Sequence, residues 1–289
     1  MLPRFAFSIS LFIGPKFLSG WLGVLGMAFA LTVPLHAHGA LHERMQQLLA
    51  ALERNPSEAR AHFELAEVFV RHGDFSLALA SADSADEFQP GEFPTDLLRG
   101  EALLGLGRPS LARVALGRFL KSQPAHARAL VLRARARRAT DGPDAALSDY
   151  RAALRSSPRP NPDHVREAAE VFVTCEQHDE AIQILAHALA QLGPDPALLQ
   201  QALELEISAG RTDDALAHIT ALQAHAPRPE PWMARRARVL TAASRPAEAR
   251  AAWLVLLTHL DTLPNLERGS PALLAHAAEA RAALAALTL

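Results

Sequence analysis

Apolar residues recur at three- and four-residue spacing along most of this chain, and the runs that show this spacing come in pairs. In one pair, the first run contains Phe63, Phe69 and Val70, and the second contains Leu77 and Ala85. This spacing places the apolar side chains on one face of an α-helix, which then buries that face against a neighbour. The pattern therefore predicts pairs of amphipathic helices and an all-α fold.

The pairs repeat every 34 residues, with one residue inserted near Asn161-Pro162. Small residues, turn glycines and closing prolines all keep this period. They are Pro56, Pro90, Pro124 and Pro158; Ala78, Ala112 and Ala146; Ala181, Ala215 and Ala249; Gly73, Gly107 and Gly210; and Ala66, Gly100, Ala134, Ala169 and Ala237. Glycine can end a helix, proline stops its continuation, and small residues let paired helices approach closely. Because one pair cannot bury its own apolar stripe, the pairs must stack into a solenoid.

This pattern resembles the tetratricopeptide repeat family. Large residues stand at the family's first-helix site (Phe69, Leu103, Phe172 and Leu240) and aromatic residues at its second-helix site (Tyr150 and Trp253), while Asp141 replaces the turn glycine of the third unit. The resemblance covers six units, at residues 59–92, 93–126, 127–161, 162–195, 196–229 and 230–263. It implies a right-handed α-solenoid whose first helices line a concave groove that binds a peptide or protein.

The family register assigns particular side chains to that groove. They are Arg60, Phe63, Glu67, Arg71, Leu97, Glu101, Arg128, Val131, Arg135, Arg138, Arg166, Glu170 and Arg238. The middle of the groove is rich in arginine, and arginine binds carboxylates through two parallel hydrogen bonds. An acidic segment or a chain terminus is therefore one expected ligand. The alternative is a solvated face in which these arginines pair with Glu101 and Glu170 of neighbouring units.

Helices are also expected on both sides of the repeats. Residues 40–58 should contain a leading helix, over 41–54, and residues 264–289 a trailing helix that begins at Pro271 with Ser270 as its N-cap. Helices of this kind cover the end faces of a solenoid.

The amino-terminal residues 1–39 have the layout of a secretory signal peptide. Arg4 and Lys16 precede an uncharged apolar run from Phe17 to Pro34, and small residues follow it. Cleavage after Gly39 is the first choice and cleavage after Ala37 the second. An uncleaved inner-membrane anchor is the alternative, because the run just reaches the length that spans a bilayer. Both readings place the repeats outside the cytoplasm, most simply in a periplasm.

Composition excludes several classes of protein. The net charge of −2, from 29 basic and 31 acidic residues, gives no electrostatic basis for binding nucleic acid. A single cysteine, Cys175, rules out an internal disulfide framework. The sequence Gly105-Leu-Gly107-Arg108 follows a helix instead of a strand, so it is a turn and not a phosphate loop. No catalytic set, HExxH motif or cofactor signature occurs, so no enzyme activity or cofactor is expected.

Histidine offers the one alternative chemistry. His38 and His42 lie near the expected cleavage site, and a free amine beside such a ring can chelate copper. The sequence therefore leaves two hypotheses open: an exported, non-catalytic scaffold that binds a protein or peptide in its groove, or an envelope protein that handles metal through these histidines.

Overall fold

The computed structural model describes the backbone of residues 33–287 and the side chains of residues 41–287, and within this range it contains helices and no strand. The expected all-α solenoid is confirmed. Twelve of the helices form six consecutive antiparallel pairs. They are α2 (Ala59–His72) with α3 (Phe75–Phe88), α4 (Thr95–Gly105) with α5 (Pro109–Ser122), α6 (Ala127–Asp141) with α7 (Pro143–Ser156), α8 (Pro162–Thr174) with α9 (His178–Leu192), α10 (Pro196–Ser208) with α11 (Thr212–His225), and α12 (Glu230–Ala242) with α13 (Pro246–Thr262).

Small residues at the helix crossings explain the tight pairing. The six second-helix alanines that keep the 34-residue period are all 0% exposed. Gly100 has the same function in the second unit, because a Cβ built on it would lie 2.4 Å from Cγ of Leu116. Large side chains fill the remaining space between layers, and Tyr150, Phe172 and Trp253 are the largest of those that are fully buried. The core is therefore one continuous series of clusters along the solenoid and not a single globular centre.

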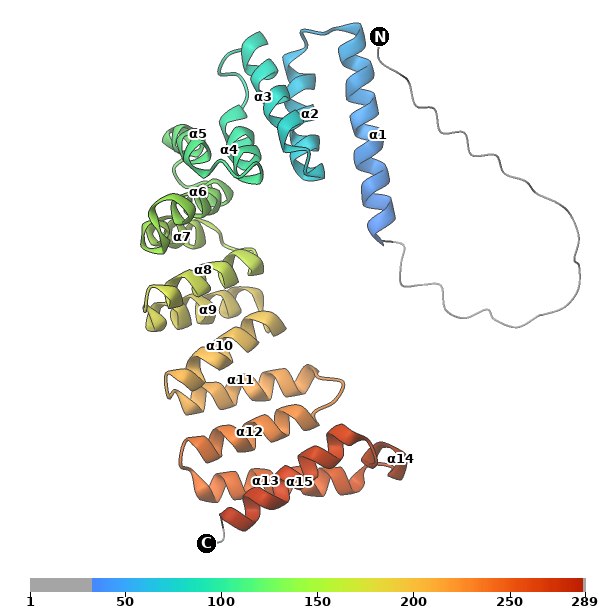
Figure 1. Ribbon diagram of the computed structural model, residues 1–289, viewed down its shortest axis with the longest axis vertical. Coiled ribbons are helices and arrows are strands. Elements are labelled where there is room, and N and C mark those ends of the chain that lie inside the picture. Colours follow the sequence, from blue (N-terminus) through green and yellow to red (C-terminus); the bar gives the residue numbers. More distant parts are fainter. Residues whose placement is uncertain (1–32, 288–289) are drawn as a thin grey trace, which may run out of the picture.

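The pairs stack into a long open arc (Figure 1). First helices of successive units contact one another, as α2 contacts α4, α4 contacts α6 and α8 contacts α10, whereas the second helices pack mainly against their own partners and the next first helix. Elements on the inner side of a bend lie closer together than those on its outer side. The first helices therefore line the concave face, and the second helices form the back of the arc.

Helix α1 (Val33–Arg54) packs on α2 at the amino-terminal end and begins earlier than the expected leading helix. Pro34 lies in its first turn, where the missing N–H of proline breaks no helical hydrogen bond. Of the expected signal peptide, residues 1–32 lie outside the described residues. None of the helices from residue 33 onward combines the length and apolar composition that crossing a bilayer requires.

The carboxyl-terminal end is covered by α15 (Pro271–Ala286), which packs on α12 and α13 and follows the short helix α14 (Asn265–Arg268). Ser270 occupies the N-cap position of α15, and its carbonyl accepts a hydrogen bond from the N–H of Leu274. The expected side-chain cap is wrong, however, because the buried Oγ of Ser270 makes no hydrogen bond.

Candidate functional site

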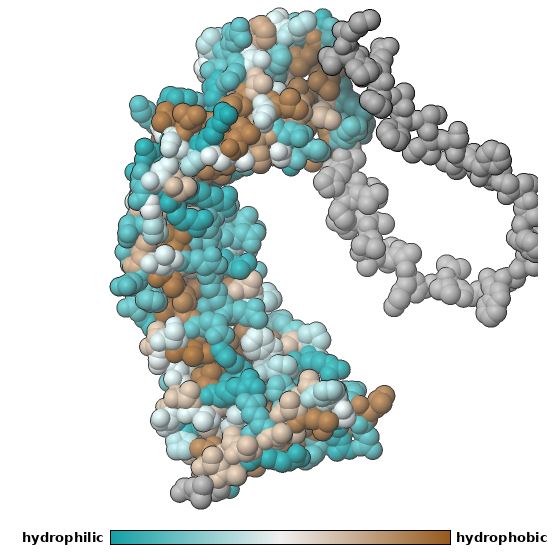
Figure 2. All heavy atoms as spheres, in the orientation of Figure 1, coloured by the Kyte–Doolittle hydropathy of each residue, from teal (hydrophilic) through white to brown (hydrophobic). Residues whose placement is uncertain are grey.

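The concave face is polar in its middle and carries apolar patches over the amino-terminal helices (Figure 2). The assignment of Val131 to this face is wrong, because Val131 is only 2% exposed. It occupies the same place in its unit as Phe63 and Leu97, which are half-buried. The short valine side chain ends inside the layer between neighbouring helices, where a longer side chain would reach the surface.

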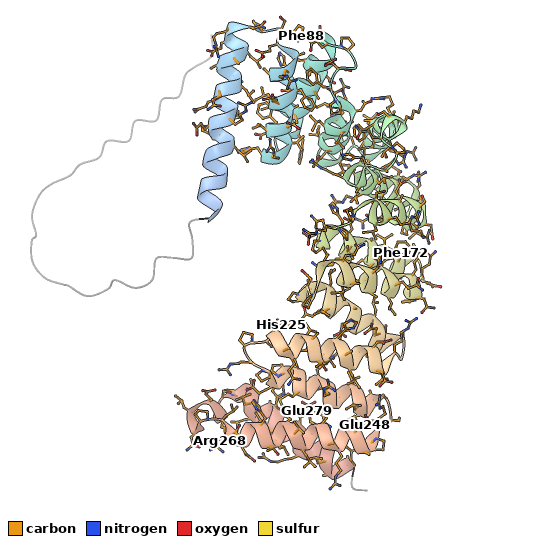
Figure 3. The ribbon with its side chains drawn as sticks, turned by 180° about the vertical axis from the view of Figure 1, so that it is seen from behind. Phe88, Phe172, His225, Glu248, Arg268 and Glu279 are labelled. Atoms are coloured by element: carbon orange, nitrogen blue, oxygen red, sulfur yellow. The ribbon has the colours of Figure 1, made fainter. Side chains whose placement is uncertain are left out.

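Along the concave face, ion pairs join the first helices of successive units to one another and to the two terminal helices. We call this set of ion pairs the inner ladder. Its pairs are Arg44–Glu64 (α1 to α2), Glu101–Arg128 (α4 to α6), Arg135–Glu167 (α6 to α8), Glu204–Arg235 (α10 to α12) and Arg238–Glu279 (α12 to α15). The guanidinium of Arg238 donates two hydrogen bonds of 2.5 and 2.6 Å to Glu279, which is labelled in Figure 3. Most of the arginines in the groove therefore already bind a carboxylate of the same chain.

The rung at the centre of the ladder involves more side chains than a single ion pair. The guanidinium of Arg135 donates hydrogen bonds of 2.7 and 2.9 Å to Oε2 of Glu167, and the hydroxyl of Tyr150 donates one of 2.8 Å to Oε1. Arg138 lies 3.7 Å from the same carboxylate. Burial alone would raise the pKa of Glu167, but the hydrogen bonds from Arg135 and Tyr150 outweigh it and lower that pKa. Burial and the bond to Glu167 raise the pKa of Tyr150.

The ladder has no rung between α2 and α4, and a hollow lies over α2, between α1 and the connection that joins α3 to α4. We call it the groove pocket; its volume is about 380 Å³, and it is lined by Arg44, Arg60, Phe63, Glu64, Glu67, Val68, Arg71, Glu92 and Phe93. Four of the residues assigned from the sequence, Arg60, Phe63, Glu67 and Arg71, thus come together in one place.

The groove pocket has an aromatic floor and unpaired charges. The rings of Phe63 and Phe93 stack with their centroids 5.1 Å apart, and the Arg60 guanidinium lies over the Phe93 ring at 5.9 Å. Neither Arg60 nor Arg71 forms an ion pair with a described residue; Nε of Arg71 donates only to the backbone carbonyl of Glu67. The site can therefore hold a flat apolar group and place a polar or acidic group beside two available guanidinium groups. The carboxylates of Glu67 and Glu92, which also form no ion pair with a described residue, share the lining and can receive a basic group.

The other assigned residues do not join this pocket. Leu97 packs against the central core cluster. Arg166 lies 3.9 Å from Asp163 of its own helix, and its carbonyl accepts a hydrogen bond from Gln201 of α10. Glu170 is exposed and forms no ion pair among the described residues, so the expected pairing of the arginines with Glu170 is wrong and Glu167 takes that place.

Several residues of the site were not expected from the sequence. Arg44 lies on the leading helix, and Glu92 and Phe93 lie in the connection between α3 and α4, which the family register does not assign to the groove. A signal for Phe93 existed, because that connection spans residues 89–94 and is longer than the four residues 123–126 at the next junction. An aromatic residue in a longer connection could have been placed beside the groove on that ground.

Metal ligands do not gather in the described part of the chain, where no three histidine, cysteine or acidic residues lie close enough to hold an ion. Nε2 of His42 lies 3.0 Å from the amide nitrogen of Gln46. The side chain of His38 lies outside the described residues, so the copper hypothesis stays a prediction. Burial and a hydrogen bond with Asp144 raise the pKa of the Cys175 thiol, which disfavours the reactive thiolate.

Comparison with known proteins agrees with the helix pairs. A model of the tetratricopeptide repeat family matches residues 46–93 and 97–159, which extend from α1 to α7. The remaining pairs continue the same period and the same buried alanines. The matched part of the chain consists of tetratricopeptide repeats. No curated protein matches its sequence.

Solved structures superpose on this chain at low sequence identity. PilF of Pseudomonas aeruginosa is 16% identical and superposes with a TM-score of 0.50 over 76% of this chain and 97% of its own. A tetratricopeptide repeat protein of Parabacteroides merdae is 17% identical, with a TM-score of 0.49 over 89% and 95% of the two chains. YrrB, described as having an unusual peptide-binding site, is 18% identical, with a TM-score of 0.41 over 80% and 97%.

Proposed function

We propose that this tetratricopeptide repeat protein is an exported, non-catalytic scaffold that binds a protein or peptide along its concave face. The groove pocket is the principal contact in this proposal. The observation that carries it is the hollow over α2, where an aromatic floor and two arginines without ion pairs meet.

The charges of the groove favour binding at this end. An acidic ligand that approached Arg135 or Arg238 would have to displace Glu167 or Glu279, and the displaced carboxylate would lose its partner. At Arg60 and Arg71 no such exchange is needed. We therefore assign the acidic group of the ligand to the groove pocket and an aromatic side chain next to it to the Phe63 ring.

Photo-crosslinking in the native host tests the proposal. A benzophenone amino acid replaces Phe63 in one strain and Leu111, an exposed side chain at the back of the arc, in another. We expect a discrete adduct from position 63, and we expect it to disappear in an Arg60→Glu/Arg71→Glu background. An Arg250→Glu change, on an exposed arginine of α13, is the matched control and should leave the adduct intact.

The outcomes separate the possible surfaces. Adducts from position 111 alone would place the partner on the back and refute the groove assignment, and no adduct at either position would count against a binding scaffold. Export has its own test, which is amino-terminal sequencing of the protein recovered from fractionated cells. A start at Ala40 or His38 in the envelope fraction supports it, and an intact amino terminus in the cytosol contradicts it.

A further inference from the structure

The one insertion in the 34-residue period lies beside a hollow on the opposite side of the arc from the groove. The extra residue lengthens the connection between α7 and α8 to residues 157–161, whereas the connections before α6, α10 and α12 span only 123–126, 193–195 and 226–229. Pro160 of this longer connection is buried against the neighbouring second helices. The insertion thus alters the back of the arc, which the concave binding site does not use.

This hollow, which we call the back pocket, lies between α7 and α9, the second helices of the third and fourth units. Its volume is about 180 Å³, which is room for one large aliphatic side chain. Its apolar lining consists of Leu154, Pro160, Ile184 and Ala188. Leu154 and Ile184 are half-buried, so the lining is open to solvent on one side.

The rim of the back pocket is positively charged. Glu180 is the one carboxylate in its lining, and Arg151 binds that carboxylate through hydrogen bonds of 2.5 and 2.6 Å. The Arg151 guanidinium is also held 4.9 Å over the ring of Phe172, which Figure 3 labels near the middle of the arc. Arg155, in the lining, and Arg159, in the connection, are exposed and form no ion pair with a described residue. The guanidinium of Arg155 therefore remains available beside the apolar hollow, with that of Arg159 in the adjoining connection.

We propose that the back pocket is a second binding site, which takes a short acidic segment of a partner protein. An aliphatic side chain of that segment enters between Leu154 and Ile184. A carboxylate within one or two residues of it binds Arg155, with Arg159 adding to the field. We choose an acidic segment because the rim is positively charged. A basic or purely apolar segment would leave both arginines without an opposite charge.

Peptide binding to the full chain tests the site. Three fluorescein-labelled pentapeptides serve as probes: Ser-Asp-Leu-Asp-Ser, the basic analogue Ser-Lys-Leu-Lys-Ser and the polar analogue Ser-Asp-Ser-Asp-Ser. We expect the first to bind more tightly than both analogues by fluorescence anisotropy. Arg155→Glu should weaken the binding of Ser-Asp-Leu-Asp-Ser by about tenfold, because one charge-assisted hydrogen bond is lost. Arg250→Glu, the matched reversal on an exposed arginine far along the chain, should change it by less than about twofold.

Further variants distinguish this site from the groove and from folding effects. Ile184→Ala should weaken the acidic leucine peptide, while Leu254→Ala, on another partly exposed side chain, should not; circular dichroism must show the same helix content in all variants. If Arg60→Glu removes binding and Arg155→Glu does not, the peptide occupies the groove and the proposal is wrong. Equal affinity for the three peptides also overturns it. The proposal is also wrong if the chain dimerises with increasing concentration and Arg155→Glu abolishes the dimer, because the occupant would then be a second copy of the chain.

Discussion

The turn after the first helix offers a stability test with two opposite signs. In five of the six units this turn makes the same pair of backbone hydrogen bonds. In the first unit the N–H of Gly73 donates to Val70 and that of Asp74 to Phe69; in the sixth, Ser244 donates to Thr241 and Arg245 to Leu240. Such a turn requires a left-handed residue at its first position. That residue is a glycine in three units but Glu176 and Ser244 in the other two, with φ of 60° and 56°.

The backbone angles set the expected magnitude. A left-handed conformation costs an L-residue about 1–2 kcal/mol, and glycine avoids this cost but loses about 0.5–1 kcal/mol more entropy on folding. Ser244→Gly and Glu176→Gly should therefore each stabilise the protein by about 0.5–1 kcal/mol, because the hydrogen bonds stay the same. Gly210→Ser should destabilise it by a similar amount. A Cβ at Gly210 meets no atom within 4 Å, so that loss would come from the backbone alone.

Thermal unfolding followed by circular dichroism measures the effect, with a shift of about 2–4 °C per kcal/mol in a chain of this size. Repeat proteins can unfold in steps, so hydrogen exchange at the amide of Arg245 gives a local reading of the same turn. Ser76→Gly, near the start of α3, is the control and should destabilise, because glycine is unfavourable within a helix. If Ser244→Gly fails to stabilise while Gly210→Ser costs nothing, the left-handed turn does not determine these energies.

Two further predictions concern packing and acid stability. Gly100→Ala should lower the free energy of unfolding by about 1–3 kcal/mol, because the new Cβ would overlap the side chain of Leu116. Gly117→Ala should raise it by about 0.5–1 kcal/mol, because a Cβ there meets no atom within 4 Å and alanine favours the helix. Urea unfolding compares the two variants. The lowered pKa of Glu167 means that its contribution to stability is complete above the ordinary glutamate pKa and is lost as the pH falls through the folded value. The Glu167→Gln variant should thus be less stable than the wild type at neutral pH but lose less stability on acidification. The measurement is the free energy of unfolding of both proteins at several pH values. If that free energy falls equally with pH in the two proteins, the prediction is wrong.

The period of the sequence was sufficient to predict the helices, because each small or helix-ending residue has one physical role that recurs every 34 residues. It could not predict which side chains would reach the surface. Val131 and Phe63 occupy the same place in their units, yet only the longer phenylalanine extends beyond the helix layer. The earlier start of α1 was missed because the leading helix was expected only after the cleavage site, at residue 41, whereas α1 begins at Val33 with a proline that is well tolerated in a first helical turn.

The candidate site was predicted in part because the register of the first helices determines which positions face inward. Arg60 and Arg71 were found in this way. Of the inner ladder only a pairing with Glu101 was expected, since the ladder joins residues 20 to 41 positions apart whose distance depends on how the units stack. Phe93 was missed because it lies between helices, where no periodicity applies. Sequence spacing thus identified the arginines of the groove without showing which of them were already neutralised.

The inner ladder changes where specificity for a ligand can arise. When a ligand carboxylate replaces Glu167 on Arg135, one charged hydrogen bond is exchanged for another and the half-buried Glu167 keeps only its contacts with Tyr150 and Arg138, so little free energy is gained. Binding energy is available mainly where the ladder is interrupted. One interruption, between α2 and α4, lies beside the groove pocket. The other is the contact between α8 and α10, where Gln201 donates to the carbonyl of Arg166 and its own buried Oε1 has no partner. A ligand that extends from the groove pocket along the concave face must cross the paired centre of the groove, so its acidic residues should contribute most at the groove pocket and least at that centre.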